Sequence, residues 1–198
     1  MKNKINFIRL YLTKNITNYT VKLLLQKYNA DLDQVILNIE KEFQCQKKEL
    51  KLCSFQEAEK YLAESERKNI KILSIYDSEY PKNLLTLNTA PVILHCKGNI
   101  KLLNNDNIAV IGSRNASLQG LSITKQITSK LSEKYTIISG LAKGIDAIAH
   151  ENSIQNTIAV LGCGVEVVYP IENKKLYQSI LNNNSLIISE YQNFQEPR

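Results

Sequence analysis

The first third of the chain carries apolar residues at the spacing of amphipathic helices. These residues recur every three or four positions, the period at which side chains line one face of a helix. The pattern covers four segments, namely residues 8–16, 21–28, 32–39 and 54–68. Glycine and proline, which interrupt helices, are both missing from this stretch. We therefore predict a small bundle of three or four helices over residues 1–66, with Thr20 and Asp31 as N-caps of the second and third helices.

The pattern changes at residue 70, where short β-rich runs begin to alternate with helical segments. The predicted strands are residues 70–76, 91–98, 107–113, 135–140, 156–162 and 185–191, and the predicted helices are residues 117–133, 144–154 and 173–182. The last four strands are nearly continuous apolar runs, which is typical of a parallel sheet covered on both faces. The predicted fold class is α/β: a Rossmann-like, doubly wound, mainly parallel sheet over residues 67–198, preceded by the small all-α domain.

Glycine marks the places where these strands end, since all seven glycines lie between Gly98 and Gly164. In an open α/β sheet, ligands bind beyond the carboxyl ends of the strands. Helix N-termini at that edge offer N–H groups and partial positive charge to an anion. The formal net charge of +6 agrees with a polyanionic partner. We therefore predict an anion site formed by three strand-to-helix junctions.

The first junction, 110-VIGSRNAS, combines a turn with groups that hold phosphates. Gly112 allows a tight turn, and Ser113 offers a hydroxyl and an N–H. Arg114 can bind a phosphate through two parallel hydrogen bonds. Ser117 is a candidate N-cap for the following helix. The alternative interpretation is an ordinary turn with a surface arginine.

The second junction, 139-SGLAKGIDAIAH, has the composition of a phosphate cradle. Ser139 and Gly140 end a strand, and Lys143 and Gly144 precede a helix. Their order fits neither the Walker loop nor the dinucleotide-binding G-x-G-x-x-G motif.

Asp146 and His150 lie four residues apart on one face of the helix that begins there. One interpretation makes them an acid/base or metal-binding pair. The other, which we favour, makes them a local hydrogen bond that fixes helix and loop. Because neither a nucleophile nor a third metal ligand is apparent, we predict no catalytic residue, no metal and no cofactor.

In the third junction, 161-LGCGVEVVYPIEN, Gly162 and Gly164 flank Cys163 and allow close approach to the backbone. We expect Cys163 to be a small packing residue rather than a reactive thiol. Tyr169 either stacks on a nucleobase or covers the core, and the sequence does not decide between these roles.

Other features exclude several classes of protein. The four cysteines have no C-x-x-C spacing and only two histidines accompany them, so a zinc site is not expected. No apolar run approaches the roughly 20 residues of a membrane-spanning helix. The N-terminus lacks the continuous apolar core of a signal peptide. We therefore expect a cytoplasmic protein without a membrane partner.

The three junctions together resemble the DprA/Smf family of DNA-processing proteins. The matching blocks are G-S-R with a later Ser and Gly (Gly112–Arg114, Ser117 and Gly120), S-G-L-A-basic-G-I-D-x-x-A-H (Ser139–His150), A-V-L-G-x-G with V-Y-P-x-E-N (Ala159–Asn173), and S-E-Y (Ser189, Glu190 and Tyr191). The resemblance covers about residues 75–191, and its middle block is long and specific.

This resemblance implies a protein that binds single-stranded DNA without a chemical step. In natural transformation it would protect incoming strands and load the RecA recombinase onto them. The resemblance also implies that Arg114 contacts a backbone phosphate, with Ser113, Gly140 and Lys143 beside it. The helical domain would resemble a sterile-alpha-motif or helix-hairpin-helix module, although 15-NITN replaces the glycine-containing turn of the hairpin.

The family pattern continues beyond S-E-Y with an F-P-x-R-N-R block and further sheet and helix, whereas this sequence ends at 191-YQNFQEPR. We therefore expect a Rossmann-like domain that is incomplete at its C-terminal end, where family members form homodimers and meet RecA. Two other functions stay open. A nucleotide-binding enzyme similar to phosphoribohydrolases would use Asp146 or Glu190 as an acid, and a vestigial fragment would bind no DNA.

Overall fold

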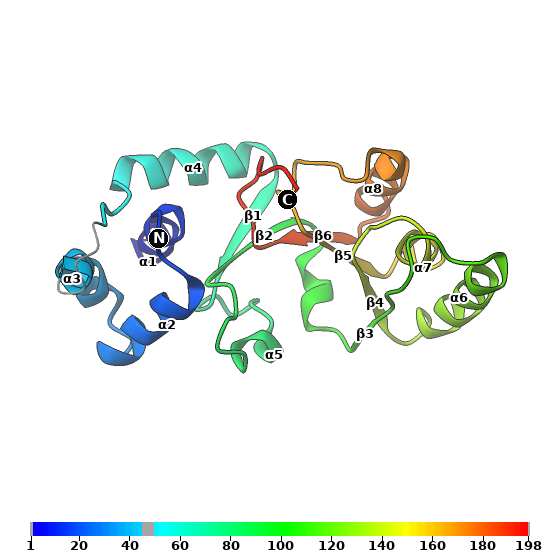
Figure 1. Ribbon diagram of the computed structural model, residues 1–198, viewed down its shortest axis with the longest axis horizontal. Helices are drawn as coiled ribbons and strands as arrows, with labels where there is room; N and C mark the ends of the chain where they lie inside the picture. The colour runs from blue at the N-terminus through cyan, green and yellow to red at the C-terminus, as the bar shows by residue number, and fades with distance from the viewer. Residues whose placement is uncertain (1, 45–49, 198) are drawn as a thin grey trace. The chain divides into compact units, whose positions relative to one another are not determined.

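The computed structural model describes residues 2–44 and 50–197 (Figure 1). Contacts within the chain divide it into two compact units. The helical unit consists of Met1–Lys68 and Ile72–Ile93, and the α/β unit consists of Asn69–Lys71 and Leu94–Arg198. Residues 72–93, which we predicted as part of the Rossmann-like domain, are grouped with the helical unit.

The helical unit contains the four predicted helices. They are α1 (Lys2–Leu12), α2 (Asn18–Lys27), α3 (Leu32–Gln44) and α4 (Phe55–Arg67), and a short helix, α5 (Lys82–Leu85), follows later in the chain. Each long helix contributes buried apolar side chains to one core, among them Phe7, Leu24, Val35 and Ala58. Helices of this length are marginal on their own, so the shared burial of their apolar faces holds them together.

Side-chain caps fix where these helices begin. Thr17, not Thr20, caps α2: its backbone is extended and its hydroxyl accepts the N–H of Thr20. The prediction of Thr20 was wrong by one turn because either threonine has the right chemistry. Asp31 caps α3 as predicted, since its carboxylate accepts the backbone N–H of Gln34 at 3.1 Å. Ser54 caps α4 within a capping box.

The sheet has six strands in the order β1-β2-β6-β5-β4-β3. Their bounds are β1 (Ile70–Ser74), β2 (Ile93–Gly98), β3 (Asn107–Ala109), β4 (Thr136–Ser139), β5 (Thr157–Leu161) and β6 (Leu186–Ser189). Strands β3, β4, β5 and β6 run parallel to one another. Strand β2 runs antiparallel to β6, with His95 opposite Ser189. The predicted mainly parallel sheet is confirmed, with β2 as an antiparallel strand.

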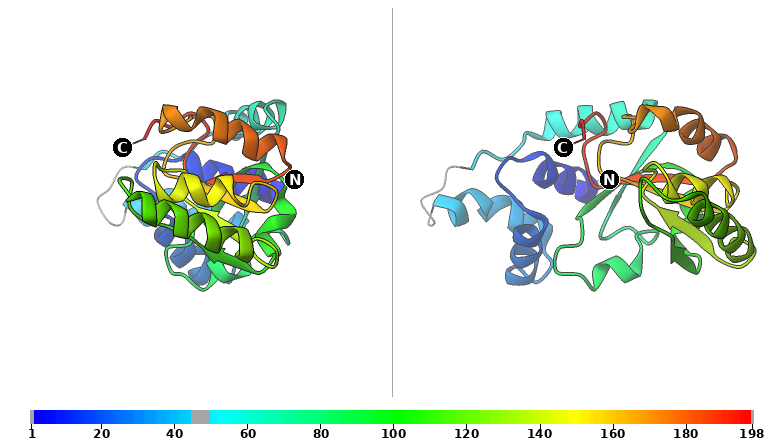
Figure 2. Two further views of the ribbon diagram at one scale, coloured as in Figure 1. Left: turned by 90° about the vertical axis from the view of Figure 1, so that its right-hand side faces the viewer. Right: turned by 45° about the vertical axis from the view of Figure 1, so that its right-hand side comes forward.

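The connecting helices are α6 (Leu118–Leu131), α7 (Ile145–Glu151) and α8 (Lys174–Asn182). Because β3 to β6 are neighbours in chain order, right-handed crossovers place all three helices on one face. The left view of Figure 2 shows the three side by side on that face. This differs from the expected cover of helices on both faces. On the other side a 3-10 helix, η1 (Ile100–Asn104), packs against β5.

The first predicted strand-to-helix junction is longer than we expected. Strand β3 ends at Ala109, four residues before the predicted end. The N–H of Val110 still donates to the carbonyl of Ile138 in β4, and beyond it the N–H of Gly112 turns to Asp146 of α7. The helices after the junctions begin within one residue of their predicted starts. The third junction also contains a 3-10 turn, η2 (Ile171–Asn173). The helix starts were therefore predictable from the sequence, whereas the paths of the junction loops were not.

Over residues 2–44 and 50–197, no helix is long and apolar enough to cross a membrane. The same residues contain no group of three or more His, Cys, Asp or Glu side chains placed to hold a metal ion. Cys53, Cys96 and Cys163 are free thiols, while Cys45 lies outside the described residues.

Candidate nucleic-acid interface

The three junctions meet around one cavity of about 420 Å³ at the carboxyl ends of the parallel strands. Its lining comes from all three junctions and from the C-terminal segment: Arg114, Asn115, Gly140, Ala142, Lys143, Leu161, Gly162, Cys163, Tyr169, Pro170 and Pro197. The predicted convergence of the junctions at one edge of the sheet is therefore confirmed. Five of the predicted site residues line this cavity, namely Arg114, Gly140, Lys143, Gly162 and Tyr169.

The first junction presents Arg114 to solvent. Among the described residues, the guanidinium of Arg114 forms no hydrogen bond or ion pair, so its donors are available to a ligand. The neighbouring backbone is held in place: the carbonyl of Ser113 accepts the N–H of Ile145 at 3.2 Å, and the Ser113 hydroxyl accepts the N–H of Asn115 at 3.1 Å. Ser117 caps α6 as predicted, by accepting the N–H of Gly120.

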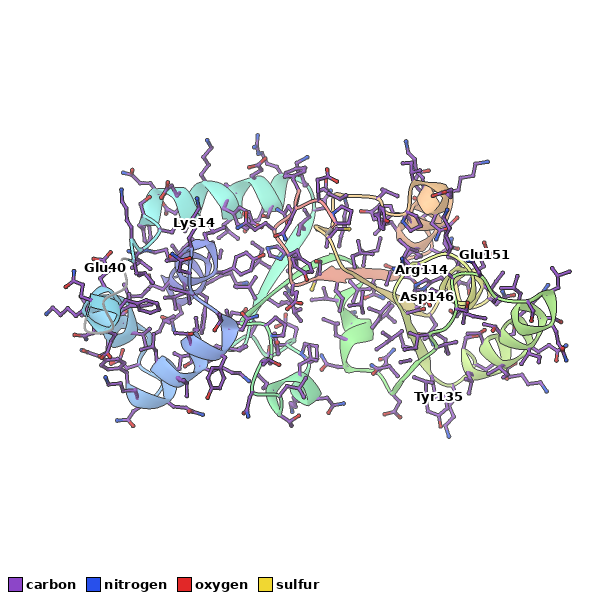
Figure 3. All side chains as sticks on the ribbon, in the orientation of Figure 1. Lys14, Glu40, Arg114, Tyr135, Asp146 and Glu151 are labelled. Carbon is purple, nitrogen blue, oxygen red and sulfur yellow. The ribbon has the colours of Figure 1, made fainter. Side chains whose placement is uncertain are left out.

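The second junction is organised around the carboxylate of Asp146, which is 6% exposed. Its Oδ2 atom accepts the backbone N–H groups of Gly140 at 3.1 Å and Ala142 at 3.4 Å. Its Oδ1 atom accepts the N–H of Gly112 at 3.4 Å. The Asp146 side chain is labelled in Figure 3. The protein's own anion thus fills the cradle of N–H groups that we assigned to a phosphate.

Two predicted contact residues serve the loops rather than the cavity surface. Ser139 is 2% exposed, and its hydroxyl donates to the carbonyl of Val110 at 2.7 Å. Gly144 has φ +77°, and a Cβ atom there would overlap the carbonyl oxygen of Ser113. Close packing of the first junction on the start of α7 therefore explains Gly144 without a ligand.

His150 and Asp146 do not form the pair that we considered. His150 is fully buried, and its Nδ1 atom lies 2.7 Å from the hydroxyl oxygen of Thr157. Burial lowers the pKa of His150 to about 4, against smaller opposing effects of Asp146 and the Ser139 backbone. The predicted hydrogen bond between Asp146 and His150 is wrong, because each side chain turns to a different partner. Neither Asp146 nor His150 lines the cavity, so the two do not form an acid/base pair there.

Lys143 extends from the second junction and pairs with Glu172 of the third. The Lys143 Nζ atom lies 2.5 Å from Glu172 Oε1, and both side chains are more than half exposed. The hydrogen bond from Lys143 holds the pKa of the Glu172 carboxyl below its usual value. The next residue, Asn173, donates its amide to the carbonyls of Leu141 and Ala142 at 2.9 and 3.1 Å. The third junction therefore clamps the second.

The glycines of the third junction have different surroundings. Gly162 lines the cavity, and a Cβ atom there would meet nothing within 4 Å. Gly164 instead packs against the C-terminal segment: its N–H donates to the carbonyl of Gln195, and a Cβ atom would overlap the carbonyl oxygens of Gln192 and Asn193. Gly164 is therefore outside the cavity lining, and its lack of a side chain serves chain packing.

Cys163, Tyr169 and Glu190 differ in exposure. Cys163 is 2% exposed, and burial raises the pKa of its thiol, which agrees with a packing residue. Tyr169 is 52% exposed and lines the cavity, so it does not cover the core. Glu190 is exposed at the end of β6 and does not line the cavity. The core-covering role of Tyr169 is therefore wrong, and Glu190 is not placed as an acid at the cavity.

The sequence did not reveal several contributors to this site. Asn115, Ala142, Leu161, Pro170 and Pro197 line the cavity, while Glu172 and Asn173 fix its cationic edge. Glu172 and Asn173 belong to a block that we had noted only as a match to the family pattern, so that block was the available signal. The assembled features define a Rossmann-like α/β protein with an arginine, a lysine and an exposed tyrosine around one cavity.

The chain belongs to the DNA recombination-mediator protein A family, whose sequence pattern matches residues 71–198. This confirms the resemblance to DprA and Smf. The DNA processing protein DprA of Streptococcus pneumoniae is 44% identical over 127 residues, which are 63% of this chain and 45% of that protein. Protein Smf of Synechocystis is 34% identical over 139 residues, which are 66% of this chain and 35% of that protein. The chain thus spans less than half the length of both relatives.

Solved structures agree with this assignment. The X-ray structure of DprA from Streptococcus pneumoniae superimposes with a TM-score of 0.64 at 34% identity, covering 92% of this chain and 70% of the other. The structure of DNA processing protein A from Helicobacter pylori, described for its single-stranded DNA binding mode, has a TM-score of 0.60 at 33% identity. The superposition with the Helicobacter pylori protein covers 65% of this chain and 59% of that protein's chain. The predicted fold class is confirmed by both.

Proposed function

We propose that this chain binds single-stranded DNA in the cavity formed by the three junctions. The observation that carries the proposal is the exposed guanidinium of Arg114, which has no hydrogen-bond or ion-pair partner within residues 2–44 and 50–197. It lies on the wall of a cavity that Tyr169 also lines. A guanidinium can donate two parallel hydrogen bonds to one phosphate. A cavity with a cation and an aromatic ring can therefore take a phosphate and an adjacent base.

Single strands are the preferred form because of Tyr169. Its ring is about half exposed at the cavity, and a base can stack on it only when that base has left its own duplex stack. Stacking of this kind contributes about 1–3 kcal/mol per base and depends little on sequence. Backbone binding adds affinity that falls with salt, by about 0.7 log units per phosphate contact for each log unit of salt.

The wider role rests on family membership rather than on geometry. We propose that the chain acts in DNA processing without catalysing a chemical step, in the cytoplasm, by protecting single strands and presenting them to the RecA recombinase. Homodimer formation stays a prediction. Its test is sedimentation of the chain over a range of concentrations, and RecA recruitment is tested by filament formation on coated strands.

The competing proposal of a nucleotide-processing enzyme needs an acid at the cavity. Asp146, the first candidate, is nearly buried and accepts three backbone N–H groups, which supports a role in holding the loops. A nucleoside monophosphate that bound the native state would raise the melting temperature. We expect no such rise at concentrations where an oligonucleotide produces one.

Fluorescence anisotropy of a labelled oligonucleotide tests the proposal. We expect the wild-type chain to bind the single strand more tightly than the matching duplex, with affinity that falls as salt is raised. Equal binding of both forms would contradict the stacking argument. The lack of binding to either form at low salt would contradict the proposed function as a whole.

A further inference from the structure

Glu172 forms an ion pair with Lys143, which lines the cavity together with Arg114. The carboxylate and the ammonium are 2.5 Å apart, and Arg114, the other cation, has no such partner among the described residues. Opposite charges this close largely cancel for a third charge nearby. Within the part of the chain that the structure describes, a phosphate entering the cavity therefore meets the unpaired Arg114 and the already paired Lys143.

The placement of Glu172 is fixed by the fold. Its neighbour Asn173 donates two hydrogen bonds to the carbonyls of Leu141 and Ala142, in the loop that ends at Lys143. Leu141 itself has φ +57° and is fully buried, so this loop has a defined, uncommon conformation. Glu172 and Lys143 therefore lie on two loops whose backbones are joined, beside the ion pair, by the hydrogen bonds of Asn173.

We propose that Glu172 is an internal competitor for the DNA phosphate: it pairs with Lys143 in the free protein, and the backbone of a bound strand displaces it. This inference rests on the proposed function and assigns Glu172 the role of limiting affinity. Displacement breaks one exposed ion pair, a modest cost. Binding therefore stays reversible, and only a ligand whose phosphate reaches Lys143 gains the second cation.

A double-mutant cycle on Glu172 and Lys143 tests this competition. We expect Glu172→Gln to bind a single-stranded oligonucleotide about two- to fivefold more tightly than wild type, the range for losing one exposed ion pair. In the Lys143→Met background, the gain from Glu172→Gln should shrink, because no ion pair remains to be broken.

Glu151→Gln is the matched control, since Glu151 is exposed on α7, lies outside the cavity lining and changes the net charge equally (Figure 3). Melting temperatures of all variants should match wild type. If wild type binds but Glu172→Gln gains no more than Glu151→Gln, or gains equally in both backgrounds, Glu172 is an ordinary surface charge and the inference fails. If neither the wild type nor any variant binds the oligonucleotide, the proposed function is wrong, and the inference that rests on it is wrong as well.

Discussion

The Oδ2 atom of Asp146 lies 3.1 Å from the backbone nitrogen of Gly140, so a carboxylate of the protein occupies the turn that we had assigned to a phosphate. The same carboxylate also reaches the first junction through the N–H of Gly112. Asp146 thereby joins the two loops that carry Arg114 and Lys143. The N–H groups of Gly112, Gly140 and Ala142 are therefore bonded to Asp146 in this structure.

Asp146→Asn should lower the free energy of unfolding by about 1–3 kcal/mol, because an amide cannot accept three N–H groups and turns its own donors toward them. Urea denaturation followed by circular dichroism measures this loss. Asp106→Asn, at an exposed loop position, is the control and should change stability by less than about 0.5 kcal/mol. Equal stability of the two variants would show that Asp146 does not hold the loops.

Two glycines of the junctions should respond in opposite ways to alanine. Gly144→Ala should cost about 2–4 kcal/mol, because a Cβ atom there has φ +77° and overlaps the Ser113 carbonyl oxygen. Gly162→Ala should change stability by less than about 0.5 kcal/mol, since its Cβ atom points into open space. Thermal unfolding of both variants decides the matter. A stable Gly144→Ala protein would mean that the first junction is not packed on α7 as described.

Stability should fall as the pH is lowered from about 6.5 toward 4. Burial lowers the pKa of both His95 and His150 from 6.5 to about 4, so both rings are neutral in the folded protein within this range. The unfolded chain then binds more protons than the folded one, which favours unfolding. Each histidine contributes up to about 3 kcal/mol over the full range.

Urea denaturation at pH 7, 6 and 5 measures this dependence. The slope of stability against pH between 6.5 and 5 should flatten in a His95→Gln/His150→Gln double variant, whatever its absolute stability. Carboxyl groups such as Glu172, whose pKa lies below 4.5, contribute only at lower pH. An unchanged slope in the double variant would contradict the burial of the two rings.

Much of the fold follows from hydrophobic periodicity alone. The four helices of the helical unit, the six strands and the three crossover helices all lie where the apolar pattern predicts them. Local chemistry was less decisive, because Thr17 and Thr20 are both good N-caps and only the backbone conformation selects Thr17. The position of helices on one face depends on strand order, which period-2 and period-3.6 patterns do not encode.

The candidate site was predictable in its location and less so in its contacts. Glycines after strands and the G-S-R motif identified the edge of the sheet and Arg114. The sequence could not reveal that Ser139 turns inward to Val110, or that Lys143 pairs with Glu172 from a junction 29 residues away. Both depend on which loops the sheet brings together. Residue type at a strand end therefore predicts a site more reliably than it predicts which atom faces the ligand.

Substitution of Arg114 tests single-strand binding in the cavity most directly, because its guanidinium lines the cavity and has no partner among the residues that the structure describes. Anisotropy of a labelled single strand should show that Arg114→Ala weakens binding by about 5- to 150-fold, equivalent to about 1–3 kcal/mol, and lowers the salt slope by about 0.7. Arg67→Ala, which removes an exposed arginine of α4 outside the cavity lining, should bind nearly as wild type. If both variants bind as well as wild type, or lose affinity equally, single strands are not held in this cavity.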